Sequence, residues 1–217
     1  MQKKIKEIFG KFKKSETGIW VLIAAVSVEW LGWSFSDPFL SIFFEKILGS
    51  IFLVGVLVAA RNILALFVAI FVGERVENFS TRSLILWEKT FFLLQILLFF
   101  LAGIYHSPVL LFAAMFVGAF ARPVRDIATN SFLIFHAPRK KSSRIFGILV
   151  AAKNLFWIAG AVFSGFFLQS IAQNLGKNFD EVLFFSFLPA IPALIFGFFL
   201  LHFLPMEKSA PRKTHRF

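Results

Sequence analysis

The sequence predicts an all-α, polytopic membrane protein with six transmembrane helices, and three observations lead to this prediction. First, six long apolar stretches separated by brief polar turns fill almost all of the 217 residues. About 20 apolar residues coiled as a helix cross the hydrocarbon core of a bilayer. Second, 58% of the residues are hydrophobic, 33 are phenylalanine and the mean hydropathy is +0.78, which a soluble domain of this length does not accommodate. Third, the polar–apolar alternation of a membrane β-barrel is absent, and lipid leaves only helices as the other spanning structure.

The six predicted spans form one bundle over residues 18–204, with a basic segment on either side. In order along the chain they cover residues 18–44, 50–73, 84–104, 108–135, 144–171 and 182–204. Residues 1–17 are expected to be retained as a cytoplasmic segment rather than cleaved as a signal peptide. The apolar stretch that follows is too long for a signal peptide and contains Glu29. Residues 205–217 are expected to be a basic cytoplasmic tail or the start of a linker.

The basic residues in the turns predict how the bundle is oriented. Lysine and arginine number six in residues 1–17, two in 74–83, four in 136–144 and four in 205–217. These sixteen lie on one side, whereas the opposite turns hold only Lys46 and Lys177. By the positive-inside rule both termini are cytoplasmic, and a plasma or cytoplasmic membrane is expected. The net charge of +11 therefore indicates topology and not a nucleic-acid partner.

Ionisable residues within the spans are the first candidates for function, because a charge at mid-helix costs about 2.5–3.5 kcal/mol on insertion scales. Span one holds Glu29 and Asp37, span two Arg61, span four Arg122, Arg125 and Asp126, and span five Lys153 beside Asn154. Spans three and six have only Glu88 and Lys89 near one end, so we expect these two spans to form the lipid-facing exterior. The order repeats after three spans and predicts two three-helix repeats of inverted topology, as in transporters. Coincidence among so few charges is the alternative.

Depth along the spans predicts which charges meet. Glu29 and Arg61 each lie about 11 residues into their spans, which at about 1.5 Å per residue is near mid-membrane. Asp126 and Lys153 lie at similar heights in spans four and five. We therefore expect proximity of Glu29 to Arg61 and of Asp126 to Lys153. Such pairs line a cavity or, alternatively, only hold helices together.

Several function classes are excluded by residues that are missing. The sequence has no cysteine, so disulfides and thiolate metal sites are impossible. Its four histidines are scattered without the spacing of metal ligands. The spans carry no serine–histidine pair, Glu-Glu motif or histidine box. We therefore predict that the protein is not an enzyme and uses no metal or cofactor.

The turn after the second span carries a recognisable motif. Gly73, Glu77 and Arg82 match a loop signature of the major facilitator superfamily, in which an acid follows a glycine by four residues and a basic cluster comes next. Three other positions of the signature are replaced, by Asn78, Ser80 and Thr81. The motif lies in the expected cytoplasmic turn between spans two and three.

Two further segments resemble the same family. Residues 33–39 (WSFSDPF) are similar to the first helix of drug-efflux members. The stretch from Gly160 to Gly165 looks like the glycine-rich motif of the fifth helix, with alanine in place of its proline. Small residues there also allow two helices to pack closely, which is a purely structural explanation. The family's fourth-helix arginine is not matched, although Arg122 and Arg125 lie one turn lower.

The resemblance covers the whole chain and implies the amino-terminal six-helix half of a major facilitator transporter. It implies a central cavity lined by the first and fourth helices, gates formed by the second and fifth, and lipid-facing third and sixth helices. It also implies that the turn with Gly73, Glu77 and Arg82 takes part in a cytoplasmic gate. The implied partners are the lipid bilayer, a small-molecule substrate and a second six-helix half. That half is a separate chain, a further portion of this protein or a second copy of the chain.

Together, the residues and the resemblance predict secondary active transport of a small solute by alternating access. The expected cavity and coupling residues are Glu29, Trp33, Asp37, Arg61, Arg122, Asp126, Lys153 and Asn154. Glu29 and Asp37 are expected to exchange protons, and the basic residues of the spans to attract an anion. Trp30, Trp33 and Trp157 offer apolar walls, or serve only in packing. The alternatives are a six-span channel, an accessory membrane subunit without transport activity of its own, and a remnant without function.

Overall fold

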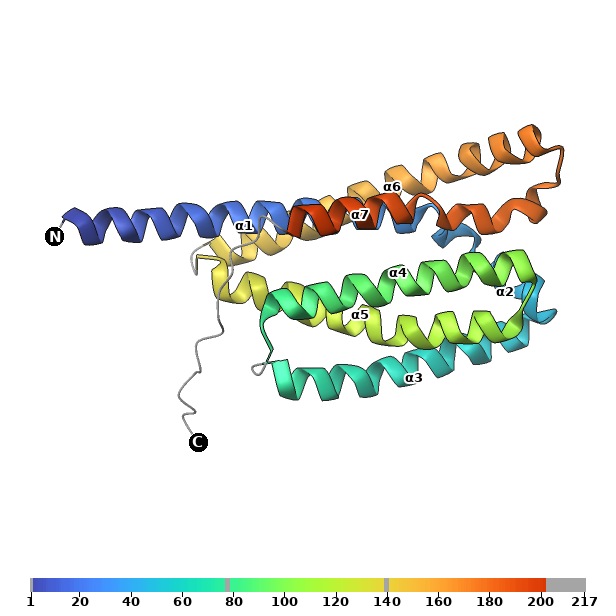
Figure 1. The fold of residues 1–217 in the computed structure, drawn as a ribbon, viewed down its shortest axis with the longest axis horizontal. Helices are drawn as coiled ribbons and strands as arrows, with labels where there is room; N and C mark the ends of the chain where they lie inside the picture. The colour runs from blue at the N-terminus through green and yellow to red at the C-terminus, as the bar shows by residue number, and fades with distance from the viewer. Residues whose placement is uncertain (1, 77–78, 139–140, 202–217) are drawn as a thin grey trace.

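A computed structural model describes residues 2–76, 79–138 and 141–201 of the chain (Figure 1). Within these ranges the secondary structure is helical, and six helices are long and apolar enough to cross a membrane. The prediction of an all-α, six-span membrane protein is therefore confirmed. The predicted tail at residues 205–217 lies outside the described residues.

The first span, predicted over residues 18–44, is one crossing but not one continuous helix. It consists of α1 (Gln2–Ser34), the short 3-10 helix η1 (Asp37–Phe39) and α2 (Leu40–Leu48). Pro38 lies within η1 and has no amide proton to continue an α-helix. The hydroxyl of Ser34 donates to the carbonyl of Leu31 at 2.7 Å, and that of Ser36 to Trp33 at 2.8 Å. These bonds stabilise the break, which places Asp37 on a turn inside the span.

The other spans begin and end at conventional signals. They are α3 (Ile51–Arg75), α4 (Thr81–Tyr105), α5 (Pro108–His136), α6 (Ser142–Leu175), and the pair η4 (Phe179–Phe187) and α7 (Ala190–Leu201). Ser80 and Ser107 cap α4 and α5 by accepting backbone hydrogen bonds with their hydroxyls. Gly49 and Gly176 end α2 and α6 with φ of +69° and +63°, a region that favours glycine. The sixth span is a 3-10 helix followed by an α-helix.

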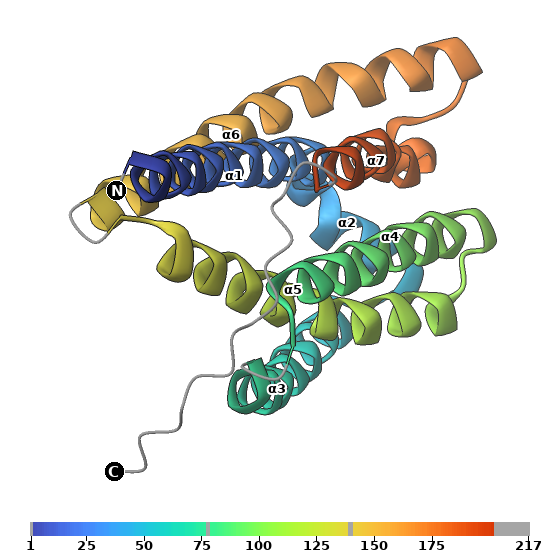
Figure 2. The same ribbon diagram turned by 60° about the vertical axis from the view of Figure 1, so that its left-hand side comes forward.

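The helices form two layers, with α1, α6 and α7 in one and α3, α4 and α5 in the other (Figures 1 and 2). The first helix of each three-span unit packs on the second and third helices of the other unit. Thus α1 packs mainly on α6 and α7, and α5 mainly on α3 and α4. Each three-span unit therefore makes the same set of contacts with the other, which is what the two predicted repeats require.

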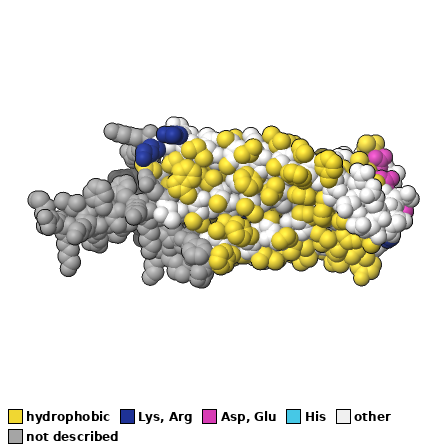
Figure 3. Space-filling view, turned by 90° about the horizontal axis from the view of Figure 1, so that it is seen from above, with side chains coloured by type: hydrophobic (Ala, Val, Ile, Leu, Met, Phe, Trp, Pro, Cys, Tyr) yellow, Lys and Arg dark blue, Asp and Glu magenta, His cyan; other side chains and the backbone are white. Residues whose placement is uncertain are grey.

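Within this bundle the spans predicted as the lipid-facing exterior, three and six, are more buried than spans two and five, and their contact with lipid stays a prediction. In their most apolar stretches α3 and α6 are only 17% and 11% buried, against 44% for α4 and 39% for the η4–α7 span. The reason is a contact across the two layers, because α4 also packs on η4 and α7. The second and fifth spans are the most exposed. Along the face shown in Figure 3, an apolar belt covers the middle of the bundle, and described charges are confined to its ends.

Of the two glycines predicted as a fifth-helix motif, only Gly160 lies in a close helix contact. A Cβ placed on Gly160 would lie 2.6 Å from the carbonyl oxygen of Leu31 and closer still to the hydroxyl of Ser34. Both of these neighbours belong to α1. A Cβ on Gly165 would meet nothing within 4 Å. Gly160 therefore fixes the approach of α6 to α1, whereas Gly165 does not.

The Gly160→Ala substitution is expected to destabilise the bundle by about 1–3 kcal/mol, the usual cost of overpacking. At roughly 2–4 °C per kcal/mol for a chain of this size, the melting temperature falls by several degrees. Thermal unfolding in mild detergent measures the shift, with Gly165→Ala as the matched control that stays close to the wild type. Equal shifts for the two substitutions would show that α1 and α6 do not pack closely at Gly160.

Candidate functional site

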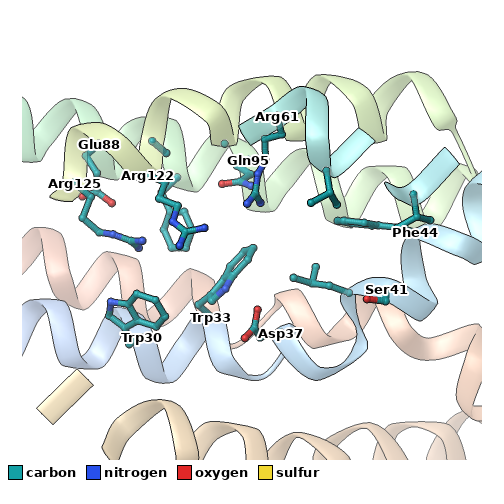
Figure 4. Close-up of a pocket in the computed structure, with 16 residues that line it drawn as sticks. Trp30, Trp33, Asp37, Ser41, Phe44, Arg61, Glu88, Gln95, Arg122 and Arg125 are labelled. Atoms are coloured by element: carbon teal, nitrogen blue, oxygen red, sulfur yellow. The ribbon is translucent and has the colours of Figure 1, made fainter. Parts of the chain in front are cut away.

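A cavity of about 370 Å³ lies between the two layers, at the lower end of the roughly 300–1,000 Å³ usual for ligand pockets. Figure 4 shows its walls. The polar residues that line it are Asp37, Ser41, Arg61, Glu88, Gln95, Arg122 and Arg125. They come from both three-span units, so the site exists only because the two units pack together.

One wall of the cavity is cationic. Arg61 of α3 and Arg122 and Arg125 of α5 extend from the same layer towards the opposite one (Figure 4). Glu88 and Gln95 come from α4, which packs on the other side of α5 from α3. Three guanidinium groups thus lie in one wall of an apolar bundle, where charges are little screened away from water.

The opposite wall is mainly aromatic. It carries Trp30 and Trp33 of α1, with Asp37 on the η1 turn (Figure 4). The ring of Trp33 lies 5.4 Å, centroid to centroid, from that of Phe92 across the layers. An oxygen of Asp37 accepts a hydrogen bond of 2.9 Å from the indole of Trp157 on α6. The wall thus presents apolar rings beside a single carboxylate.

A buried ion cluster of four side chains connects α1, α4 and α5 beside the cavity. One carboxylate oxygen of Glu29 pairs with Lys89, and the other accepts a 2.9 Å bond from Arg125. The ammonium of Lys89 lies 3.1 Å from an oxygen of Glu88. Glu29 and Lys89 are each only 1% exposed. Two acids balance two bases, which is the condition under which burial of so many charges is tolerated.

The two predicted proximities are not formed as ion pairs in the described part of the chain. Glu29 pairs with Lys89 and Arg125 instead of Arg61. Asp126 lies 3.7 Å from Arg125, while the ammonium of Lys153 lies over the ring of Trp30 at 4.7 Å. Depth gives the height of a residue in the membrane but not the direction it faces, and α3 packs mainly on α5, away from α1.

The eight predicted cavity and coupling residues divide into three groups. Trp33, Asp37, Arg61 and Arg122 line the cavity. Glu29 lies behind its wall in the ion cluster. The other three, Asp126, Lys153 and Asn154, are not among the lining residues. The side chain of Asp126 is 53% exposed, away from the cavity.

A comparison with protein families identifies the fold. The family model of the Major Facilitator Superfamily matches residues 22–216, nearly the whole chain. The chain belongs to the Major Facilitator Superfamily. Neither curated proteins nor solved structures give a significant match. The protein is therefore an integral membrane protein with the fold of one six-helix half of a facilitator, a family of membrane transporters. The resemblance to drug-efflux members stays a prediction.

The facilitator loop motif lies mostly beyond what the structure describes. Gly73 is exposed near the end of α3, and a Cβ there would meet nothing within 4 Å. Glu77 lies outside the described residues, and so does the side chain of Arg82. The gate role of this turn stays a prediction.

Sequence reasoning missed three polar residues of this facilitator, all on α4. Glu88 and Lys89 are adjacent in an apolar stretch, and this was a usable signal, because two charges there cannot both face lipid. Gln95 gave no such signal. A Cβ on Gly118 of α5 would lie 2.5 Å from the carboxamide carbon of Gln95. Because glycine has no Cβ, the side chain of Gln95 has room to line the cavity.

Proposed function

We propose that this facilitator carries a small solute across the membrane by alternating access, with the cavity between the two layers as its binding site. The observation that carries the proposal is the set of charged residues gathered around one cavity in an otherwise apolar bundle. Such residues are costly in a membrane and mark substrate pathways. They also lie where the two inverted repeats meet, the usual position of a transporter's binding site.

A second six-helix half is part of this proposal. Arg122 lines the cavity but is itself exposed, so the cationic wall is open on one side. Acyl chains against this opening would be unfavourable. The flanking helices α3 and α6 expose large apolar side chains, including Phe52 (73%) and Phe166 (70%). A partner half that covers the opening is a separate chain, a further portion of the protein or a second copy.

The partner half predicts the size of the functional unit. In mild detergent we expect an assembly of twelve spans, measured as protein mass by light scattering with correction for bound detergent. Cross-linking in native membranes should give the same size. A monomer of the 24.6 kDa chain that still transports would contradict this part of the proposal.

We also propose that both termini and the loop-motif turn are cytoplasmic. The beginning of α1, the end of α3, and the beginnings of α4 and α6 lie at one end of the bundle (Figure 1). This is the end that carries the excess of lysine and arginine in the sequence. In this orientation the turn with Gly73, Glu77 and Arg82 lies where a cytoplasmic gate would form.

Proton coupling is assigned to Asp37 rather than to Glu29. Both oxygens of Glu29 are held by basic side chains, so protonation would break two ion pairs at once. Asp37 faces the cavity and is bonded to an uncharged indole, that of Trp157. The charged groups opposite it are Arg61 from α3 and Arg122 from α5. A proton on Asp37 changes the charge of the site by one without dismantling the bundle.

An uptake experiment without an assumed substrate tests the proposal. Proteoliposomes are exposed to a defined mixture of organic acids, amines, sugars and amino acids, with and without an imposed pH gradient. Mass spectrometry of the contents should show saturable accumulation of at least one solute above protein-free liposomes. The gradient should increase this accumulation. Uptake equal to that of protein-free liposomes for every solute would contradict the proposal.

The same preparation distinguishes the channel and accessory-subunit alternatives. A channel would give stepwise currents in planar bilayers and fluxes that do not saturate. An accessory subunit would give neither currents nor uptake. We expect saturable uptake without current steps.

A further inference from the structure

Three donor groups face the cavity without an acidic partner, one from each helix of the cationic wall. Among the described residues, neither Arg61 nor Arg122 forms an ion pair. Within the part of the chain that the structure describes, Arg61 donates only to the side-chain oxygen of its neighbour Asn62, at 3.2 Å. Gln95 is 4% exposed and lines the cavity, and its carboxamide has no hydrogen-bond partner in the described part of the chain. The carboxamide of Gln95 is therefore available in the cavity to a ligand or to water.

These groups converge because the backbone brings them together. Gly118 lies beside Gln95, and because glycine has no side chain the carboxamide fits against the backbone of α5. In Figure 4 Gln95 lies between Arg122 and Arg61 in the same wall. Two planar guanidinium groups and a carboxamide supply the donors that bind a carboxylate well.

The charge balance of the cavity sets the charge of the ligand. Arg125 is already engaged, since it pairs with Glu29, and the four-residue ion cluster to which both belong is neutral. Asp126, 3.7 Å from Arg125, and Lys153, over the ring of Trp30, are one acid and one base outside the lining, so together they add no net charge. What remains is Arg61 and Arg122 against Asp37, a net charge of +1. A bound monovalent anion neutralises this charge, whereas a divalent anion would leave an excess of negative charge facing Asp37.

The rest of the cavity sets the character of the ligand's body. The ring of Trp30 is occupied, with Arg125 at 5.0 Å and Lys153 at 4.7 Å from it. Trp33, Phe44 and Phe92 line the cavity without a charged group over their rings, apart from Arg125 at 5.9 Å from Phe92. Flat apolar groups pack well against such rings.

We infer that the substrate is a monovalent organic anion with a flat apolar body, an aromatic carboxylate being the simplest example. Its carboxylate is bound by Arg61, Gln95 and Arg122, and its ring packs on Trp33. This inference rests on the proposed function, because it names the solute class for the same cavity. Anionic lipids share this chemistry, so the test separates them from a soluble anion.

The test measures binding of radiolabelled benzoate to the purified full chain, in the oligomeric state in which it is isolated. Benzoate is expected to bind saturably. Acetate, which lacks the ring, should compete at least tenfold more weakly, and benzylamine and inorganic phosphate should not compete. Strong binding of benzylamine in place of benzoate would overturn the inference.

Variants locate the site. Arg61→Gln and Arg122→Gln should each weaken benzoate binding at least tenfold, as expected for loss of a charged hydrogen bond. Arg144→Gln, a change at an exposed arginine near the start of α6, should leave it unchanged. Asp37→Asn should tighten binding, because the opposing negative charge is lost. This gain is a result that misfolding cannot produce. Benzoate binding that is insensitive to Arg61 and Arg122 would overturn the inference.

Two further outcomes separate this inference from the function on which it rests. If the uptake mixture shows transport of amines or sugars only, the inference is overturned and the transport proposal stands. If benzoate binds through the two arginines but no solute is transported, the substrate assignment is lost with the transport proposal, and only the anion site is retained. Trace amounts of phosphatidylglycerol could also displace benzoate from the wild type but not from Arg61→Gln. That result would assign the site to a lipid headgroup and overturn the inference.

Discussion

Lys89→Met is expected to destabilise the bundle by about 3–5 kcal/mol, the usual effect of removing one partner of a buried ion pair. Lys89 is 1% exposed and bridges the carboxylates of Glu29 and Glu88. Without its ammonium the cluster holds two acids and only Arg125. Methionine matches the length of the lysine stem, so the loss is mainly one of charge. Thermal unfolding and the yield of monodisperse protein in mild detergent measure the effect.

A second substitution tests whether charge is the cause. The double variant Lys89→Met with Glu88→Gln restores neutrality and keeps the 2.9 Å pair of Glu29 with Arg125. It should recover most of the lost stability. Lys46→Met, at an exposed position in α2, is the control and should behave as the wild type. If the double variant is less stable than the single one, the cluster does not act as a balanced unit.

Asp37→Asn is expected to abolish the effect of a pH gradient on uptake while leaving solute exchange intact. Asparagine retains an oxygen that can accept the hydrogen bond from Trp157, but it cannot carry a proton. The measurement uses a solute that accumulates from the uptake mixture, corrected for protein-free liposomes. Gradient-driven accumulation should fall to the level without a gradient, and counterflow exchange should continue.

Two comparisons sharpen this prediction. Asp180→Asn removes an exposed acid from η4 and should leave coupling unchanged. Glu29→Gln should reduce stability before it changes coupling, because Glu29 is held in the ion cluster. If Asp37→Asn retains full gradient-driven accumulation, the proton is carried elsewhere.

The spans and the repeat were predictable from the sequence because both depend on hydropathy and charge along the chain. A stretch such as Ile51–Arg75 is too long and apolar for any location other than the bilayer. The interruption at Pro38 had a local signal in the proline itself. We recognised no local signal for the 3-10 helix η4 with which the sixth span begins.

The partners of the charged residues were not predictable in the same way. Glu29 was expected at mid-membrane beside Arg61, yet the direction in which it faces depends on how the two layers pack. Glu88 and Lys89 were dismissed because they lie near the end of an apolar stretch, and their burial follows from α4 packing on α5. Gln95 is a site residue only through its contact with Gly118, which joins positions on different helices. No single stretch of sequence contains that contact.

The central claim is that the polar residues of both units surround one water-accessible cavity inside the bundle, and cysteine accessibility tests it most directly. The chain has no native cysteine, so each engineered thiol is the only one present. Ser41→Cys lies in the cavity wall, and Leu97→Cys replaces an outward-facing residue of α4 that is 40% exposed. In intact membranes a membrane-impermeant thiol reagent should modify Ser41→Cys and leave Leu97→Cys unmodified. Modification of Leu97→Cys with Ser41→Cys unreactive from both sides would show that the polar residues do not enclose a watery cavity.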